Sequence, residues 1–192
     1  MRIFLTLKHW QIFIIMVAIP LFFQVLEIGL FFFASGQVEL YYYYQLLMTL
    51  FWAPMFAWFY SLGAALHKRL PATVTMNLVR FKLLLFVPCI YLLLSAVFIN
   101  SVASFGLSAI QPSVPILITD QLLRFVSIAC MLYCIYFVAK ALKAVEWQKP
   151  VVLNDFTGEF FLVWFFPVGI WFIQPRINSL FDNPASPSIT TN

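Results

Sequence analysis

Four long apolar stretches, separated by short polar connections, dominate the pattern of this 192-residue chain. A helix needs about 20 apolar residues to cross roughly 30 Å of hydrocarbon, and each stretch meets that length. The pattern therefore predicts an all-α membrane protein with four transmembrane helices. The predicted spans are about Trp10–Phe33, Gln45–Leu66, Leu83–Ser101 and Gln121–Ala141.

The composition excludes a water-soluble domain. Hydrophobic residues make up 64% of the chain and charged residues 9%, against roughly 45–50% and 25% in typical globular proteins. Too few polar side chains remain to cover a surface in water. The net charge of +4 comes without a nucleic-acid-binding motif, so the basic residues indicate membrane topology and contact with anionic lipids rather than nucleic acid.

The basic residues fall on one side of the predicted membrane. Nine precede the first span, lie between spans two and three, or follow span four, whereas residues 34–44 and 102–119 contain none. The positive-inside rule therefore predicts a cytoplasmic amino terminus. The nine are Arg2, Lys8, Lys68, Arg69, Arg80, Lys82, Lys140, Lys143 and Lys149.

A fifth apolar segment, Phe160–Ile173, is shorter and contains Pro167 and Gly169. Its fourteen residues reach about 21 Å as a helix, less than a full crossing. We predict a short re-entrant or interfacial C-terminal helix, with a cytoplasmic carboxyl terminus; the alternative is a fifth span. Residues 1–181 then form a single membrane bundle, and residues 182–192, rich in Ser, Thr, Asn and Pro, form a disordered cytoplasmic tail.

Two stretches carry a resemblance to known proteins. Gly158–Asn178 reads GEFFLVWFFPVGIWFIQPRIN, and Leu7–Trp10 reads LKHW. Together they resemble a group of small, uncharacterised bacterial multi-span inner-membrane proteins with no assigned activity. The resemblance implies a bacterial inner-membrane location and supplies no catalytic residue.

Polar side chains within two spans form a candidate intramembrane site. Such residues are costly in lipid and usually face the protein interior. The depths of Glu27 in span one and Arg124 in span four match, so we predict an ion pair between them; the alternative is that Arg124 reaches the outer headgroups. The site is either a cleft for an ion, solute or lipid headgroup, or a set of bonds that holds the bundle together. Its candidate residues are Gln24, Glu27, Asp120, Arg124 and Ser127.

Span two carries small residues at intervals of four. This spacing lets a second helix approach closely, either within the chain or from another subunit. The candidate helix-packing face consists of Ala53, Ala57, Ser61 and Ala65.

The sequence contains no recognisable catalytic motif, metal-ligand set or cofactor loop, so we predict no cofactor. The leading hypothesis is a non-enzymatic structural or accessory subunit that contacts membrane lipids and a protein partner. The alternative is a subunit of a small solute or ion transporter or channel, which uses the polar site between the first and fourth spans. A third hypothesis, a membrane enzyme acting on a lipid or quinone, would use His9, His67, Asp155 or Glu159.

Overall fold

The computed structural model describes residues 3–33, 47–104 and 113–182, and every regular element within these ranges is helical. Four helices are long and apolar enough to cross a membrane: His9–Gly29, Leu47–His67, Leu78–Phe98 and Val114–Trp147. The predicted all-α membrane fold with four spans is confirmed. The elements are α1 (Ile3–Thr6), α2 (His9–Phe13), η1 (Ile14–Ala18), α3 (Ile19–Phe33), α5 (Ala53–His67), α6 (Leu78–Ser104), α7 (Val114–Trp147), α8 (Leu153–Trp164) and α9 (Phe166–Asp182).

Two prolines shape the first two spans. Pro20 has no N–H to donate to the preceding turn, and the helix widens just before it into the π-helical turn η1, where the Ile19 N–H donates to the Ile14 carbonyl. Pro54 stands in the first turn of α5, where the missing N–H costs nothing. Each proline therefore lies where its backbone geometry is tolerated.

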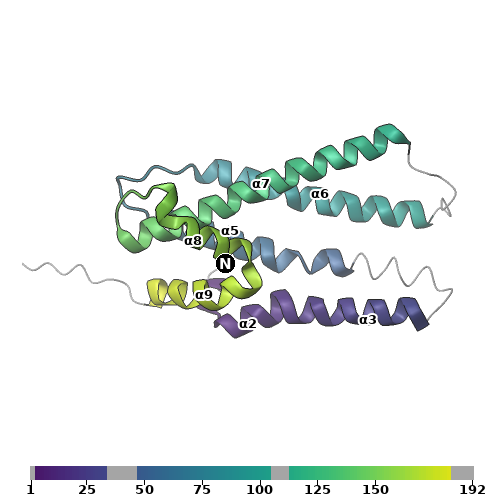
Figure 1. The fold of residues 1–192 in the computed structure, drawn as a ribbon, viewed down its shortest axis with the longest axis horizontal. Helices are drawn as coiled ribbons and strands as arrows, with labels where there is room; N and C mark the ends of the chain where they lie inside the picture. Colours follow the sequence, from purple (N-terminus) through teal and green to yellow (C-terminus); the bar gives the residue numbers. More distant parts are fainter. Residues whose placement is uncertain (1–2, 34–46, 105–112, 183–192) are drawn as a thin grey trace, which may run out of the picture.

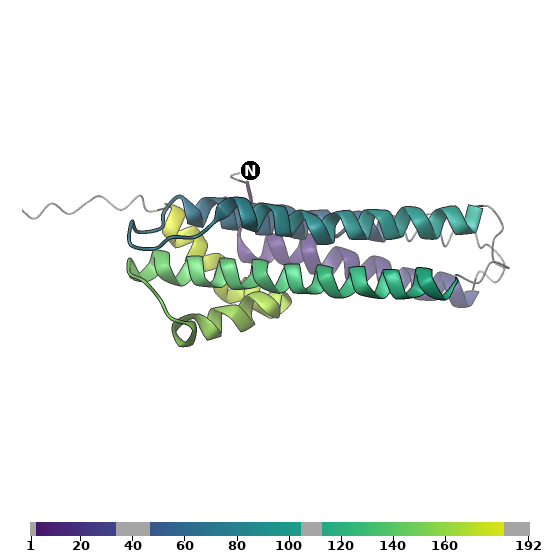
Figure 2. The same ribbon diagram turned by 90° about the horizontal axis from the view of Figure 1, so that it is seen from above.

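The long helices form an elongated bundle. Figure 1 shows α6 and α7 along one edge, α5 next to them, and α3 along the opposite edge. The α8 and α9 helices occupy only one half of the bundle's length, beside the end of α7 (Figures 1 and 2). We call this the hairpin half; the open half holds α3, the end of α6 and the start of α7.

The C-terminal apolar segment forms two helices rather than the single short helix predicted. The α8 helix ends at Trp164, and the N–H of the next residue, Phe165, donates to the Phe161 carbonyl at 2.8 Å. Pro167 then lies in the first turn of α9, which runs back beside α8 to the end of the bundle from which α8 started (Figure 1). The segment therefore doubles back within one half of the bundle (Figure 1), and neither α8 nor α9 is among the four helices long and apolar enough to span a membrane. Of the predicted tail, 182–192, Asp182 is the last residue of α9, and residues 183–192 lie outside the described residues.

The close packing of α9 against α8 requires a glycine, Gly169, in the first turn of α9. A Cβ atom added to Gly169 would lie 1.7 Å from the backbone carbonyl oxygen of Leu162. This oxygen belongs to the backbone of α8 and cannot rotate away as a flexible side chain could. The two helix backbones therefore approach each other at a distance that only glycine permits.

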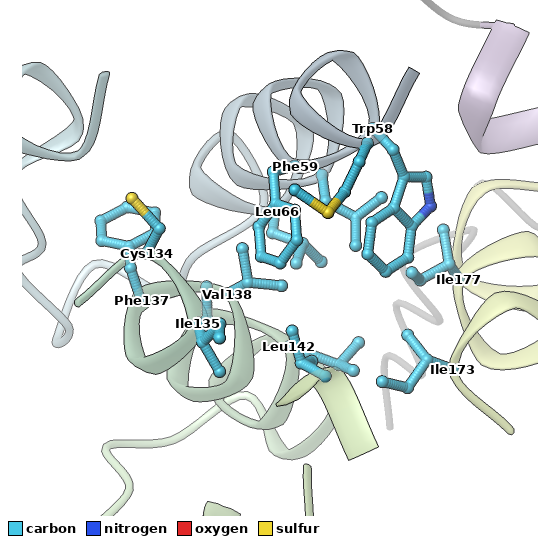
Figure 3. Packing of buried hydrophobic residues seen from close by; sticks show 14 of the residues in the cluster. Trp58, Phe59, Leu66, Cys134, Ile135, Phe137, Val138, Leu142, Ile173 and Ile177 are labelled. Atoms are coloured by element: carbon cyan, nitrogen blue, oxygen red, sulfur yellow. The ribbon is translucent and has the colours of Figure 1, made fainter. Parts of the chain in front are cut away.

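The core lies in the hairpin half. Figure 3 shows side chains from α5, α7 and α9 meeting there, with Trp58 beside Ile177. The rings of Phe81 and Phe137 stack at 4.5 Å. Large apolar side chains of the open half are instead exposed, as expected for a lipid-facing or partner-facing surface. They include Leu21, Phe22, Val25, Leu94, Val97, Leu117, Ile118 and Leu122.

Candidate functional site

Gln174 in α9 is the central polar residue of the hairpin half, and its exposed fraction is 0%. Its Oε1 accepts a hydrogen bond from the Trp58 indole of α5 at 3.2 Å. Its Nε2 lies 2.9 Å from the Phe4 carbonyl, 3.1 Å from the Leu7 carbonyl and 3.0 Å from Asn178 Oδ1. One buried amide thereby connects α9 to α5 and to the amino-terminal segment.

The amino-terminal segment is fixed to α9 by two further contacts. The Asn178 amide donates to the Leu7 carbonyl at 3.2 Å. The His9 ring lies 4.8 Å from the ring of Trp171. The two stretches that carry the family resemblance, 167 residues apart at Gln174 and Leu7, therefore contact each other in the folded chain.

Beside this amide lies a network of four charged residues from three helices. Lys143 Nζ of α7 is 2.9 Å from Glu159 Oε1 of α8. Arg176 of α9 donates to the same Glu159 oxygen at 2.8 Å, and its Nε donates to Glu146 Oε1 of α7 at 2.6 Å. Arg176 Nη2 also contacts Glu146 Oε2. Two carboxylates and two cations balance one another, so the network is neutral as a unit.

The charges in this network stabilise one another. Burial alone would raise the pKa of Glu159, but hydrogen bonds from Lys143 and Arg176 outweigh that effect, so its pKa is lowered. The hydrogen bonds that Arg176 donates to Glu146 raise the pKa of Arg176, against the opposing effect of burial. Both shifts favour the ionised forms, so the folded chain keeps the network charged.

The network holds helices together and presents no evident reacting group. Each carboxylate already accepts from a cation, and the described residues contain no group of three or more His, Cys, Asp or Glu that could bind a metal. The remaining residues of the enzyme hypothesis are engaged separately. Asp155 accepts from the Val152 N–H at 2.9 Å, and His67 Nε2 lies 2.9 Å from the Met76 carbonyl.

Two of the predicted polar residues of α7, Asp120 and Arg124, lie on the surface of the open half. Arg124 Nη2 pairs with Asp120 Oδ2 at 3.1 Å, on the same helix. Tyr91 of α6 donates to Asp120 Oδ1 at 3.0 Å and accepts from Arg124 Nε at 3.4 Å. Ser127 is buried and donates to the Leu123 carbonyl at 2.8 Å. We call Tyr91, Asp120 and Arg124 the polar triad.

The predicted Glu27–Arg124 pair is replaced by this triad. Gln24 and Glu27 line a pocket between α3 and α5, whereas Arg124 turns toward α6. Figure 1 gives the reason: α5 lies between α3 and the open half of α7, so the first and fourth spans run along opposite edges. The five candidate residues therefore form two separate groups and no single cleft between these spans.

The predicted helix-packing face of α5 is only partly covered by other parts of the chain. Ser61 is buried, Ala53 is exposed, and Ala57 and Ala65 are half-buried. Another helix approaches α5 closely at Gly63, where an added Cβ would lie 2.3 Å from the ring of Phe81. The aromatic side chain of α6 thus fits against the one position of α5 that has no side chain at all.

Lys143, Glu146, Gln174, Arg176 and Asn178 were not among the candidate residues predicted from the sequence, whereas their neighbour Glu159 was predicted under the enzyme hypothesis. Gln174, Arg176 and Asn178 stand at intervals that place Gln174 and Asn178 on one face of a helix. The predicted segment ended at Ile173, so these residues fell outside it, whereas α9 continues through Pro175 to Asp182. Polar residues on a continuing helix would have indicated a buried, hydrogen-bonded face.

The chain matches no known protein-family model, no curated protein and no solved structure. The resemblance to small bacterial inner-membrane proteins therefore stays a prediction.

Proposed function

We propose that the chain is a non-enzymatic structural or accessory subunit of a bacterial inner-membrane complex, and that its polar triad contacts a helix of the partner protein. The observation that supports this most directly is the exposure of the triad. The Arg124 and Asp120 side chains are 54% and 41% exposed, although both lie on an apolar helix long enough to span the membrane. Charged groups at such positions rarely face lipid.

The depth of the triad supports this proposal. Arg124 precedes Lys140 by sixteen residues on α7, which is about 24 Å along a helix. With Lys140 near the cytoplasmic surface, Arg124 falls within the roughly 30 Å of hydrocarbon. Apolar residues of α6 continue outward beyond Tyr91 to Phe98. The triad is therefore bordered by apolar surface on both sides along the membrane normal.

Arg124 also carries N–H donors that could bind a partner helix. A guanidinium group carries five N–H donors. Within the described residues it directs Nε to Tyr91 and Nη2 to Asp120. The other donors suit carbonyl, amide or hydroxyl oxygens on a neighbouring membrane helix, where interhelical hydrogen bonds contribute about 0.6–2 kcal/mol each.

The proposed orientation follows from the basic residues. The starts of α2, α6 and α8 and the ends of α5, α7 and α9 lie at one end of the bundle (Figure 1). Lys8, Lys68, Arg80 and Lys149 lie next to these helix ends. We place this end, with both termini, in the cytoplasm. The hairpin half then sits in the inner leaflet as a closed scaffold, and the open half presents the triad in the outer leaflet.

A double substitution tests the proposal. Asp120→Asn with Arg124→Gln removes both charges without leaving either unpaired. We expect the chain to leave its assembly, because the partner loses its charge-assisted contacts, while the chain itself stays folded on its hairpin-half core. Native electrophoresis of membranes solubilised in mild detergent measures the size of the assembly.

Glu27→Gln provides the matched control, since it neutralises a carboxylate on the opposite edge of the open half. This variant should migrate with the wild type. An assembly of unchanged size in the Asp120→Asn/Arg124→Gln variant would contradict the proposal, as would a wild-type chain that migrates as a monomer.

A further inference from the structure

One face of α7 changes in polarity along the length of the helix. Its residues follow one another at alternating intervals of four and three, which places them in one stripe on the same side of the helix. The stripe is aliphatic toward the open half, then phenolic, and then cationic toward the end of α7. In that order it consists of Leu122, Val126, Ala129, Tyr133, Tyr136, Lys140, Lys143 and Trp147.

The cations of this stripe differ in their partners. Lys143 pairs with Glu159. Lys140 is partly buried, and its Nζ donates to Tyr136 Oη at 3.3 Å and lies 5.7 Å from the centre of the same ring. None of the ion pairs within residues 3–33, 47–104 and 113–182 includes Lys140. An ammonium group carries three N–H donors, so Lys140 retains donors for an anion.

The acidic residue outside these ranges is not a neighbour of Lys140 in the sequence. Of the seven acidic residues of the chain it is the one between α3 and α5, Glu39. The end of α3 and the start of α5 lie at the opposite end of the bundle from the end of α7 (Figure 1).

Tyr136 provides a second donor beside the ammonium group. The buried Phe156 ring of α8 meets the Tyr136 ring edge-on at 5.4 Å, which fixes its position. The Tyr136 hydroxyl accepts from Lys140, and a hydroxyl also has an O–H to donate. The ammonium group and the hydroxyl lie close enough together to contact two oxygens of one phosphate.

The aliphatic part of the stripe begins beyond Tyr133 and is exposed at Ala129, Val126 and Leu122. Lys140 and Ala129 are eleven residues apart, about 16 Å along a helix. This distance is about half of the roughly 30 Å of hydrocarbon, as is the depth of one leaflet. The order of cation, phenol and aliphatic surface therefore follows the order of phosphate, ester and acyl chain in a phospholipid.

We infer that the stripe binds one anionic phospholipid from the leaflet that surrounds the hairpin half. Its phosphate contacts Lys140 and Tyr136, and an acyl chain lies along Tyr133, Ala129 and Val126. Charge complementarity favours an anionic lipid over a zwitterionic one, because the cation of a zwitterionic headgroup would lie near Lys140 and Lys143. A soluble anion would leave the aliphatic part of the stripe uncovered.

The inference is independent of the proposed function. Lys140 and Arg124 are sixteen residues apart on α7, about 24 Å. The Asp120→Asn/Arg124→Gln variant, which removes the charges of the polar triad, should therefore bind the lipid as the wild type does.

The experiment is a titration of the purified full-length protein in neutral detergent, in which native mass spectrometry counts the bound lipids. Dioleoylphosphatidylglycerol should bind with its first equivalent about tenfold more tightly than dioleoylphosphatidylcholine, which has the same acyl chains. Lys140→Gln should remove most of this preference, and Lys140→Arg, which keeps the charge, should retain it. Tyr136→Phe should weaken the binding of phosphatidylglycerol about threefold, since it loses one hydrogen bond.

Lys68→Gln is the matched control, because Lys68 is an exposed lysine at the same end of the bundle but outside the stripe. This variant should bind phosphatidylglycerol as the wild type does. Glycerol 3-phosphate, which carries the phosphate without acyl chains, should not displace the lipid. Equal binding of the two phospholipids, equal losses in Lys68→Gln and Lys140→Gln, or displacement by glycerol 3-phosphate would overturn the inference.

Discussion

Gly169→Ala is expected to lower the free energy of unfolding by about 3 kcal/mol or more, at the upper end of overpacking effects. The new methyl group would lie 1.7 Å from the Leu162 carbonyl oxygen. Relief of that clash requires α9 to move away from α8. Such a movement pulls Gln174 and Arg176 from their buried partners on α5, α7 and α8. Unfolding in a mixed-detergent titration, followed by tryptophan fluorescence, measures the change.

Gly158→Ala is the matched control for this substitution. Gly158 lies within α8, and a Cβ added there meets no atom within 4 Å. Alanine should therefore stabilise the helix by about 0.5–1 kcal/mol. Equal effects of the two substitutions would show that the close approach between α8 and α9 does not exist.

Glu159→Gln is expected to lower the free energy of unfolding by about 2–4 kcal/mol, because it removes one partner from a buried ion pair. The carboxylate accepts from both Lys143 and Arg176, and its side chain is only 8% exposed. Glutamine keeps the shape but leaves Lys143 without a counter-charge. Adding Lys143→Met should recover part of the loss, because no uncompensated cation then remains. The same detergent titration compares the single and double variants.

Lowering the pH should decrease the free energy of unfolding of the wild type, because Glu159 becomes protonated. The pKa of Glu159 lies below its ordinary value of 4.5 in the folded chain. Its contribution is therefore fully present above about pH 4.5 and is lost as the pH falls through the folded-state pKa. Glu159→Gln should remove this part of the pH dependence, whereas Asp155→Asn, at the exposed start of α8, should leave it in place. A wild-type stability curve that Glu159→Gln does not flatten would contradict the role of the network.

Span number and fold class follow from the sequence because they depend on local properties. A run of apolar residues long enough to cross a membrane predicts a helix whatever its neighbours are. The absence of a full-length span at Phe160–Ile173 was predictable for the same reason, since this segment is too short to cross. Its division into two helices at Phe165 was not, because Pro167 indicates a break without giving its geometry.

Contacts between distant segments escaped prediction. The expected Glu27–Arg124 pair relied on matching depth, but depth does not specify which helices are neighbours. In the structure Arg124 forms an ion pair with Asp120, four residues away on the same helix. The α5 helix lies between the first span and α7 (Figure 1). The Gln174 bonds to Phe4 and Leu7 join opposite ends of the chain, and no periodicity in the sequence encodes such a pairing.

Site-specific photo-crosslinking in living cells tests the proposed partner-binding role of the triad most directly. Benzoylphenylalanine at Ile128, one turn from Arg124 on the same face and exposed, should form an adduct with one other membrane protein. The adduct should disappear in the Asp120→Asn/Arg124→Gln background. The same probe at exposed Phe22 on α3 should not form it. Adducts that are identical at both positions, that contain only a second copy of this chain, or that survive the double substitution would contradict the proposed function.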